Sequence, residues 1–165
     1  GAFFGGGQEH GYRVGTENLA GIAGFGAAAK AALSGLDGFA RLANSRNAID
    51  EAIKSTGLGS VIFGANVERL PNTTCLTMPG VDSDTQVMAF DLAGIGVSAG
   101  SACSSGKTNT STVLRAMKVP DDDARSVIRG SLGWNSEASD VEAFIAAWRS
   151  LSSRVSARKI NLSAA

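Results

Sequence analysis

The sequence predicts an α/β or α+β fold, in which helices pack on a short mixed or antiparallel sheet. Some segments have apolar residues three and four positions apart, as on one face of a helix. They alternate along the chain with short segments in which every second residue is apolar, as in a half-buried strand. The chain has 165 residues, 44% hydrophobic and 18% charged, which is enough for one compact core. Alternating helices and strands are typical of helices packed on a sheet.

The first third of the chain predicts a glycine-rich loop and two helices. Residues 1–18 are typical of a loop, and we expect Thr16 to cap the helix that follows. Residues 19–34 are apolar on nearly all sides and rich in Ala and Gly, which favours a buried, closely packed helix that ends at Gly35. Residues 36–55 are amphipathic, with apolar positions at Phe39, Leu42, Ala43, Ile49, Ala52 and Ile53.

The middle of the chain predicts three short strands and one helix. Residues 61–64 and 95–100 are short apolar stretches that suit strands. Residues 72–78 alternate, with Leu76 on one face, and the turn-forming pair Pro79-Gly80 closes this strand. The helix that follows is expected to begin at Asp82 or Ser83 and to end at Gly94.

The last third predicts a helix, a strand and a long final helix. The first helix is capped by Thr110 or Ser111 and runs for two or three turns. Residues 125–132 alternate, with Ile128 and Leu132 on one face and Arg129 on the other. The final helix, capped by Asn135 or Ser136, is followed by a polar tail that frays after about residue 156. Its expected buried stripe consists of Val141, Phe144, Ile145, Trp148 and Leu151.

The segment GSACSSGKT at residues 100–108 suggests two kinds of chemistry. Its end is similar to a phosphate-binding loop, but that motif needs four residues between its first Gly and the Gly-Lys pair, and five separate Gly100 from Gly106. Cys103 has only Gly, Ala and Ser close to it in sequence, so no large neighbour buries its thiol, and Lys107 favours the thiolate. The residues alone leave two interpretations of Cys103 open: a nucleophile, or a small residue in a tight turn.

Other residues and motifs are weaker candidates for a functional site. Cys75 lies in the middle of a predicted strand, which favours a packed thiol. His10, the only imidazole, suits a surface or a site position equally well. GFGAAA at residues 24–29 matches a dinucleotide fingerprint but follows no strand, so we reject it. One His and two Cys do not complete a structural zinc site, so no metal site is expected.

The composition also limits the kinds of partner and the cellular compartment that we expect for this chain. Fifteen basic residues balance fifteen acidic ones, which argues against a nucleic-acid partner. The longest apolar runs are far short of a membrane span, and we expect no secretory signal. Two cysteines make a poor disulfide framework, so a reducing, cytoplasmic setting is expected.

Five motifs, in chain order, carry a resemblance to a known family: GGGQEHGYRVGTEN, PNTTCLTMPGVD, GIGVSAGSACSSGK, STVLRAMKV and IRGSLGWNSE. Over residues 5–151 the chain resembles the C-terminal part of a cysteine desulfurase, a class-V aminotransferase among the fold-type-I pyridoxal-phosphate (PLP) enzymes. The resemblance implies that residues 1–34 are a remnant of the large cofactor-binding domain. It also implies that residues 35–165 form the small C-terminal domain.

The resemblance implies an activity, a cofactor and partners. Such an enzyme is a homodimer that converts L-cysteine to L-alanine and a protein persulfide, with PLP as an electron sink. The sulfur then passes to an iron–sulfur scaffold or to another acceptor protein. Cys103 matches the persulfide-forming residue and would also serve as a transient iron–sulfur ligand. Thr16 matches the contact to the cofactor phosphate, and Arg129 the arginine that pairs with the substrate carboxylate, a role suited to a guanidinium fork.

The chain departs from the family pattern in several places. His10 stands where an Arg is expected, and Gly130 where a larger apolar residue is common. The family's Schiff-base lysine follows a Ser-x-His element that is expected upstream, so we expect this chain alone to be inactive. Two alternatives stay open: a stand-alone persulfide relay module, and a related class-V aminotransferase or lyase in which Cys103 is incidental. The chain's lysines all lie in other contexts: Lys30, Lys54, Lys107, Lys118 and Lys159.

Overall fold

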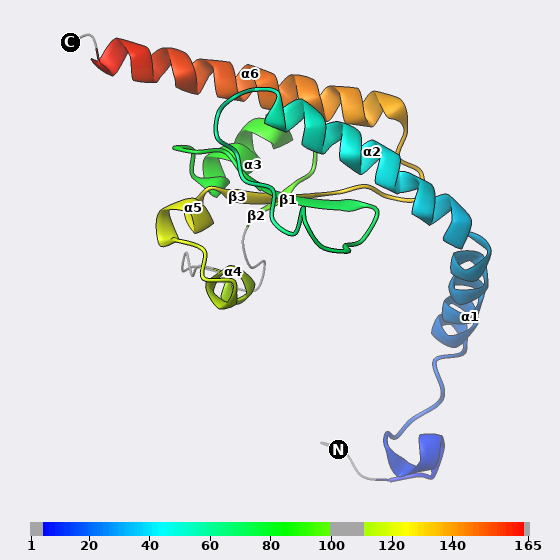
Figure 1. The fold of residues 1–165 in the computed structure, drawn as a ribbon. Helices are drawn as coiled ribbons and strands as arrows, with labels where there is room; N and C mark the ends of the chain where they lie inside the picture. Colours follow the sequence, from blue (N-terminus) through cyan, green and yellow to red (C-terminus); the bar gives the residue numbers. More distant parts are fainter. Residues whose placement is uncertain (1–4, 100–110, 164–165) are drawn as a thin grey trace. The chain divides into compact units, whose positions relative to one another are not determined.

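The computed structural model describes residues 5–99 and 111–163 (Figure 1). The chain divides into two compact units, residues 1–37 and residues 38–165. That the first unit belongs to a cofactor-binding domain stays a prediction.

Helices and short strands follow one another along the described chain, which confirms the predicted class. A 3₁₀ turn, η1 (Gln8–Gly11), comes first, and the helices and strands after it are labelled as in Figure 1. They are α1 (Leu19–Ser34), α2 (Leu36–Lys54), β1 (Thr73–Thr77), α3 (Ser83–Leu92), β2 (Ser98–Ala99), α4 (Thr112–Ala116), α5 (Asp121–Arg125), β3 (Val127–Ser131) and α6 (Ala138–Ser163).

The sheet of the second unit has three strands in the order β1–β3–β2, and both strand pairs are antiparallel. β3 is therefore the central strand, and its neighbours fix its register on both sides. The stretch 61–64, predicted as a strand, forms only an isolated bridge between Ile62 and Leu76. It adds a backbone bond of 2.8 Å from the Phe63 N–H to the Cys75 carbonyl.

The main core lies on one face of this sheet, against α2, α3 and α6 (Figure 1). Leu76 of β1 and Ile128 of β3 are register partners, and both are fully buried. From α3, Phe90 stacks on Phe144 of α6 with ring centroids 4.9 Å apart. Trp148, one turn further along α6, is 1% exposed. The predicted stripe of the final helix is confirmed, with Ile145 only partly buried.

A smaller cluster lies on part of the opposite face of the sheet. Leu114 of α4, Ala124 of α5 and Val127 of β3 form it, and Cys75 packs against its edge. Because side chains alternate along a strand, Val127 and Ile128 point to opposite faces. The sheet is thus packed on both sides, by long helices on one face and by two short helices on the other.

The start of α1 differs from the prediction. The capping side chain is Asn18, whose Oδ1 accepts a hydrogen bond of 3.0 Å from the Gly21 N–H. Thr16 lies too early in the chain for this role, so its predicted capping function is wrong. The predicted end of the helix at Gly35 is confirmed.

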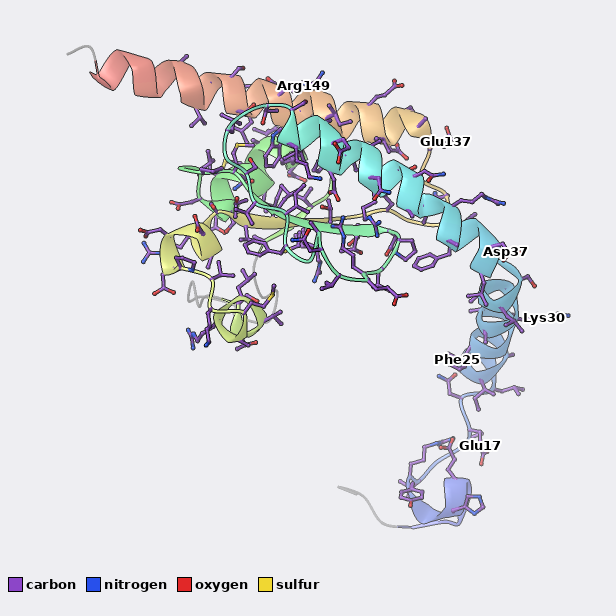
Figure 2. The ribbon with its side chains drawn as sticks, viewed as in Figure 1. Glu17, Phe25, Lys30, Asp37, Glu137 and Arg149 are labelled. Carbon is purple, nitrogen blue, oxygen red and sulfur yellow. The ribbon has the colours of Figure 1, made fainter. Side chains whose placement is uncertain are left out.

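The predicted burial of α1 is not found in the described chain, because none of its residues is buried. Leu19 is 76% and Phe25 is 79% exposed. Phe25 and Lys30 project from different sides of the helix (Figure 2). Large apolar side chains on a helix surface of this kind are typical of an element that packs against further polypeptide.

The C-terminal third departs from the prediction at its helix ends. α4 covers five residues, because Lys118 adopts a positive φ of 58° and Pro120 follows, and a separate helix, α5, then forms. Ser136 does not cap α6, since its Oγ accepts a hydrogen bond from the Gly133 N–H, and Asp140 accepts one from the Glu137 N–H. The expected fraying after residue 156 is also wrong, because α6 continues to Ser163.

A buried ionic network connects α2 to the sheet. Asp50 is 3% exposed, and its Oδ1 accepts a hydrogen bond of 2.6 Å from the Thr74 hydroxyl of β1. Its Oδ2 pairs with the guanidinium of Arg69, which lies in the segment between α2 and β1. Removing one partner of a buried ion pair leaves the other charge uncompensated.

No single helix of the described residues is long and apolar enough to cross a membrane. Only α1 and α2 counted together, across the break at Gly35, reach such a length and composition.

We expect Asp50→Ala to lower the free energy of unfolding by about 3–5 kcal/mol, because the partly buried Arg69 would lose its carboxylate and the buried Thr74 hydroxyl would lose its acceptor. The neighbouring Glu51→Ala is the matched control. It breaks an exposed pair with Lys54 and should cost less than about 1 kcal/mol. Urea denaturation followed by circular dichroism measures both, and equal costs for the two variants would contradict the structural role of Asp50.

Candidate functional site

The most prominent polar feature of the sheet is Arg129 at the middle of the central strand. In the register, Arg129 lies opposite Cys75 of β1 on one side and Ser98 of β2 on the other. Its side chain is exposed, and among residues 5–99 and 111–163 no carboxylate forms an ion pair with it. A guanidinium without a carboxylate partner, between a thiol and a hydroxyl, offers its N–H groups to an external anion.

The alternation of β3 accounts for the direction of Arg129. Ile128 is fully buried in the main core, whereas Arg129, the next residue, is exposed on the opposite face. The predicted separation of these two side chains is therefore confirmed. The burial of Ile128 holds the strand in this orientation, because turning it over would expose that side chain and bury a charge.

Cys75 is a packed thiol, as its position in the strand predicts. It is half-buried and contacts the cluster of Leu114, Ala124 and Val127. Burial raises the pKa of the Cys75 thiol above its ordinary value, and the positive charge of Arg129 offsets part of this rise. The thiol beside Arg129 is therefore neutral near pH 7 and does not neutralise the guanidinium.

Cys103 and Lys107 lie outside the described residues, so the predicted nucleophile is placed only through the elements on either side of it. β2 precedes this segment, and its Ser98 is a register partner of Arg129. α4 follows the segment, and its Leu114 is buried against Val127 of β3. Both flanking elements are thus packed against the strand that carries Arg129.

Thr16 lies in the first unit, in a loop whose carbonyl groups are bound by Arg13. The sequence did not predict this role of Arg13. The Arg13 guanidinium donates hydrogen bonds to the carbonyls of Gly15 and Thr16, at 3.0 and 2.9 Å, and pairs with Glu9 at 3.0 Å. The Thr16 side chain is exposed, and its hydroxyl is available to an anion. The position of Arg13, three residues before Thr16 in a glycine-containing loop, could have predicted this role. A guanidinium has five N–H donors and can therefore bind several carbonyl groups at once.

His10 is exposed in η1 with a φ of 58°, and no contact in the described chain assigns it a role. No group of three or more His, Cys, Asp or Glu residues in the described chain is arranged to hold a metal ion. Of the described lysines, Lys54 pairs with Glu51 and Lys30 lies on the surface of α1. Thr16 suits one contact to a phosphate, but the described residues do not assemble a complete PLP site.

Comparison with known families gives one match that covers most of the chain. Residues 6–144 match the model of the class-V aminotransferases. The chain is 40% identical to a cysteine desulfurase of Cereibacter sphaeroides over 86% of its own length, and 45% identical to a cysteine desulfurase of Frankia over 78%. These matches confirm the resemblance carried by the five motifs.

Solved structures agree with the sequence matches. The fold is similar to the X-ray structure of a NifS-like protein from Rickettsia africae, with a TM-score of 0.78, 36% identity and 90% of this chain covered. A second NifS-like protein gives a TM-score of 0.75 at 28% identity. The chain spans only 36% of the Cereibacter relative and 38% of either structure, so these proteins contain much polypeptide that has no counterpart here.

The electrostatic contact between Arg129 and Cys75 has a measurable consequence. Arg129→Gln should raise the pKa of the Cys75 thiol further, because the charge that favours the thiolate is lost. In a Cys103→Ser background, where Cys75 is the only thiol, alkylation by iodoacetamide at one fixed pH should therefore slow down. Arg125→Gln, an exposed arginine of α5, is the matched control and should leave the rate unchanged. Faster alkylation after Arg129→Gln would contradict the contact.

Proposed function

Because the chain belongs to the class-V aminotransferase family, we propose that it is the part of a cysteine desulfurase that binds the substrate carboxylate at Arg129 and receives the substrate sulfur on Cys103. One observation carries the proposal. Arg129 stands exposed at the centre of the sheet, without a carboxylate partner in the described chain, next to the strand that leads into the Cys103 segment. We infer the type of reaction from the relatives that are named cysteine desulfurases.

Arg129 would bind and orient L-cysteine. A planar guanidinium matches a carboxylate with two parallel hydrogen bonds, which fixes both the position and the rotation of the amino acid. Its lateral neighbours, Cys75 and Ser98, are neutral, so neither competes with the substrate for the positive charge. Burial on the other face of β3 keeps the strand, and therefore the arginine, from moving when substrate binds.

Cys103 would take up the sulfur. In the overall reaction the carbon–sulfur bond of L-cysteine breaks, a sulfur–sulfur bond to Cys103 forms, and the products are L-alanine and a Cys103 persulfide. The segment that carries Cys103 follows β2 directly, and β2 is paired with the strand of Arg129. The residues next to Cys103 in sequence are small, which would leave its thiol accessible first to the substrate and then to an acceptor protein.

The rest of the enzyme would come from polypeptide outside this chain. PLP, when bound, supplies the electron sink that makes the substrate carbon reactive. Thr16 would donate a hydrogen bond to its phosphate, while the Schiff-base lysine and the groups around the ring are expected in polypeptide outside this chain. We also propose that the complete protein is a cytoplasmic homodimer that passes sulfur to an iron–sulfur scaffold or another acceptor.

The proposal predicts a specific loss when Arg129 is changed in the enzyme that contains this chain together with the remaining polypeptide. Arg129→Gln should lower kcat/KM for L-cysteine roughly 10- to 100-fold, the equivalent of one charged hydrogen-bonding partner, while Arg129→Lys should recover part of the loss. Arg125→Gln should stay within about twofold of the parent. Steady-state alanine release measures all three variants, and an unchanged kcat/KM for Arg129→Gln would refute the substrate role.

A second prediction concerns the chain by itself. With L-cysteine and PLP added, the isolated 165-residue chain should release neither alanine nor sulfide, because residues 5–99 and 111–163 assemble no complete cofactor site. In the enzyme completed by the remaining polypeptide, mass spectrometry after incubation with L-cysteine should show one added sulfur on the peptide of Cys103, and Cys103→Ser should abolish it. Turnover by the isolated chain, or an added sulfur on Cys75 instead, would contradict the assignment.

A further inference from the structure

A groove of about 280 Å³ opens at one end of the sheet, within the second unit. α2 and α6 form two of its walls, the turn after α3 forms a third, and the ends of β1 and β3 form the floor. Glu137, labelled in Figure 2, immediately precedes α6, whose first two turns line the groove. A volume of this size is below the range typical of sites for drug-sized ligands and suits a smaller molecule.

This groove is separate from the surface that carries Arg129. Gly130 and Thr74, which line the floor, are register partners and belong to the face that packs against α2 and α6. Arg129 and Cys75 are the preceding and following residues on the same two strands, so they point to the opposite face. A ligand in the groove would therefore not touch the candidate substrate arginine.

The floor of the groove exists because Gly130 has no side chain. A Cβ at this position would stand 3.6 Å from the Phe144 ring and 3.7 Å from the Thr74 methyl group, within ordinary contact distance. At Gly94 and Gly96, in the turn after α3, a Cβ would have no neighbour within 4 Å. The apolar surface that remains comes from Ile49, Ile95, Leu132 and Phe144.

Two opposite charges line this apolar surface. The Arg46 guanidinium donates to the Leu70 carbonyl at 2.7 Å and, through two of its nitrogens, to Asn47 Oδ1. These bonds use three of its five N–H groups, so two are left for a ligand. On α6, Asp140 accepts one hydrogen bond with Oδ2, from the Glu137 N–H, and Oδ1 accepts no hydrogen bond from the described residues.

We propose that this groove binds a small zwitterionic α-amino acid with an aliphatic side chain. The carboxylate of such a ligand pairs with Arg46, its ammonium group with Asp140, and its side chain covers Ile95, Leu132 and Phe144. An anion alone makes no ion pair with Asp140, a cation alone makes none with Arg46, and glycine has no side chain to cover the apolar floor. The inference is independent of the proposed desulfurase activity, because it uses neither Arg129 nor Cys103.

The test is a titration of the isotopically labelled 165-residue chain with L-leucine, followed by NMR. We expect saturable shifts of the amides of Gly94, Gly96 and Gly130. 4-Methylpentanoate lacks the ammonium group and 3-methylbutylamine lacks the carboxylate, so each should bind at least about tenfold more weakly, as expected for the loss of one charged contact. Equal affinity for all three compounds, or no saturable shift with L-leucine, would overturn the proposal.

Variants localise the binding. Arg46→Gln and Asp140→Asn should each weaken L-leucine binding about tenfold or more. Asn at position 140 retains an oxygen that can accept the Glu137 N–H, so the start of α6 stays intact. Gly130→Val should fill the floor and abolish binding.

Three further variants complete the test. Arg41→Gln of α2 and Glu142→Gln of α6 are exposed, do not line the groove, and should bind L-leucine as the parent does. Arg129→Gln should also retain binding. Its loss in Arg129→Gln would place the ligand on the other face of the sheet and overturn the proposal. Should Arg46→Gln fail to fold, Arg46→Lys keeps the charge without the fork and is expected to bind with intermediate affinity.

Discussion

The structure depends on the register of β3 between β1 and β2. This strand is hydrogen-bonded on both sides, and its register places Ile128 in the main core and Arg129 on the opposite face. A slip of one residue would reverse every side chain of the strand, burying a guanidinium and exposing Ile128. The free energy that holds the candidate substrate arginine in place is therefore the burial of its apolar neighbour, and not any contact of the arginine itself.

The two faces of this strand have different surroundings, and this difference separates two kinds of chemistry. On the face of Arg129 the covering helices, α4 and α5, are short, and the segment of Cys103 joins β2 to α4. On the other face two long helices, α2 and α6, cover the sheet and leave an open groove where Gly130 lacks a side chain. Asp50 ties α2 to β1 through Thr74, which fixes one wall of that groove.

Features set by local alternation could be predicted from the sequence. The opposite directions of Ile128 and Arg129, the buried stripe of the last helix and the packed thiol of Cys75 all follow from residue spacing. The cap of α1 and the short helix α5 could not be predicted, because several neighbouring residues suit such positions equally well. Asn18 caps α1 instead of Thr16 because only its side chain reaches the Gly21 N–H. The acidic run that forms α5 has no apolar periodicity to indicate a helix.

The groove could not be predicted either, because it arises from packing between segments far apart in sequence. For the substrate site, the most direct measurement is a crystal structure of the complete enzyme with L-alanine bound. We expect both carboxylate oxygens of the ligand to lie about 2.7–2.9 Å from the Arg129 guanidinium, on the face of the sheet opposite Ile128. An Arg129 side chain paired with a carboxylate of the protein itself, with the ligand bound elsewhere, would contradict it.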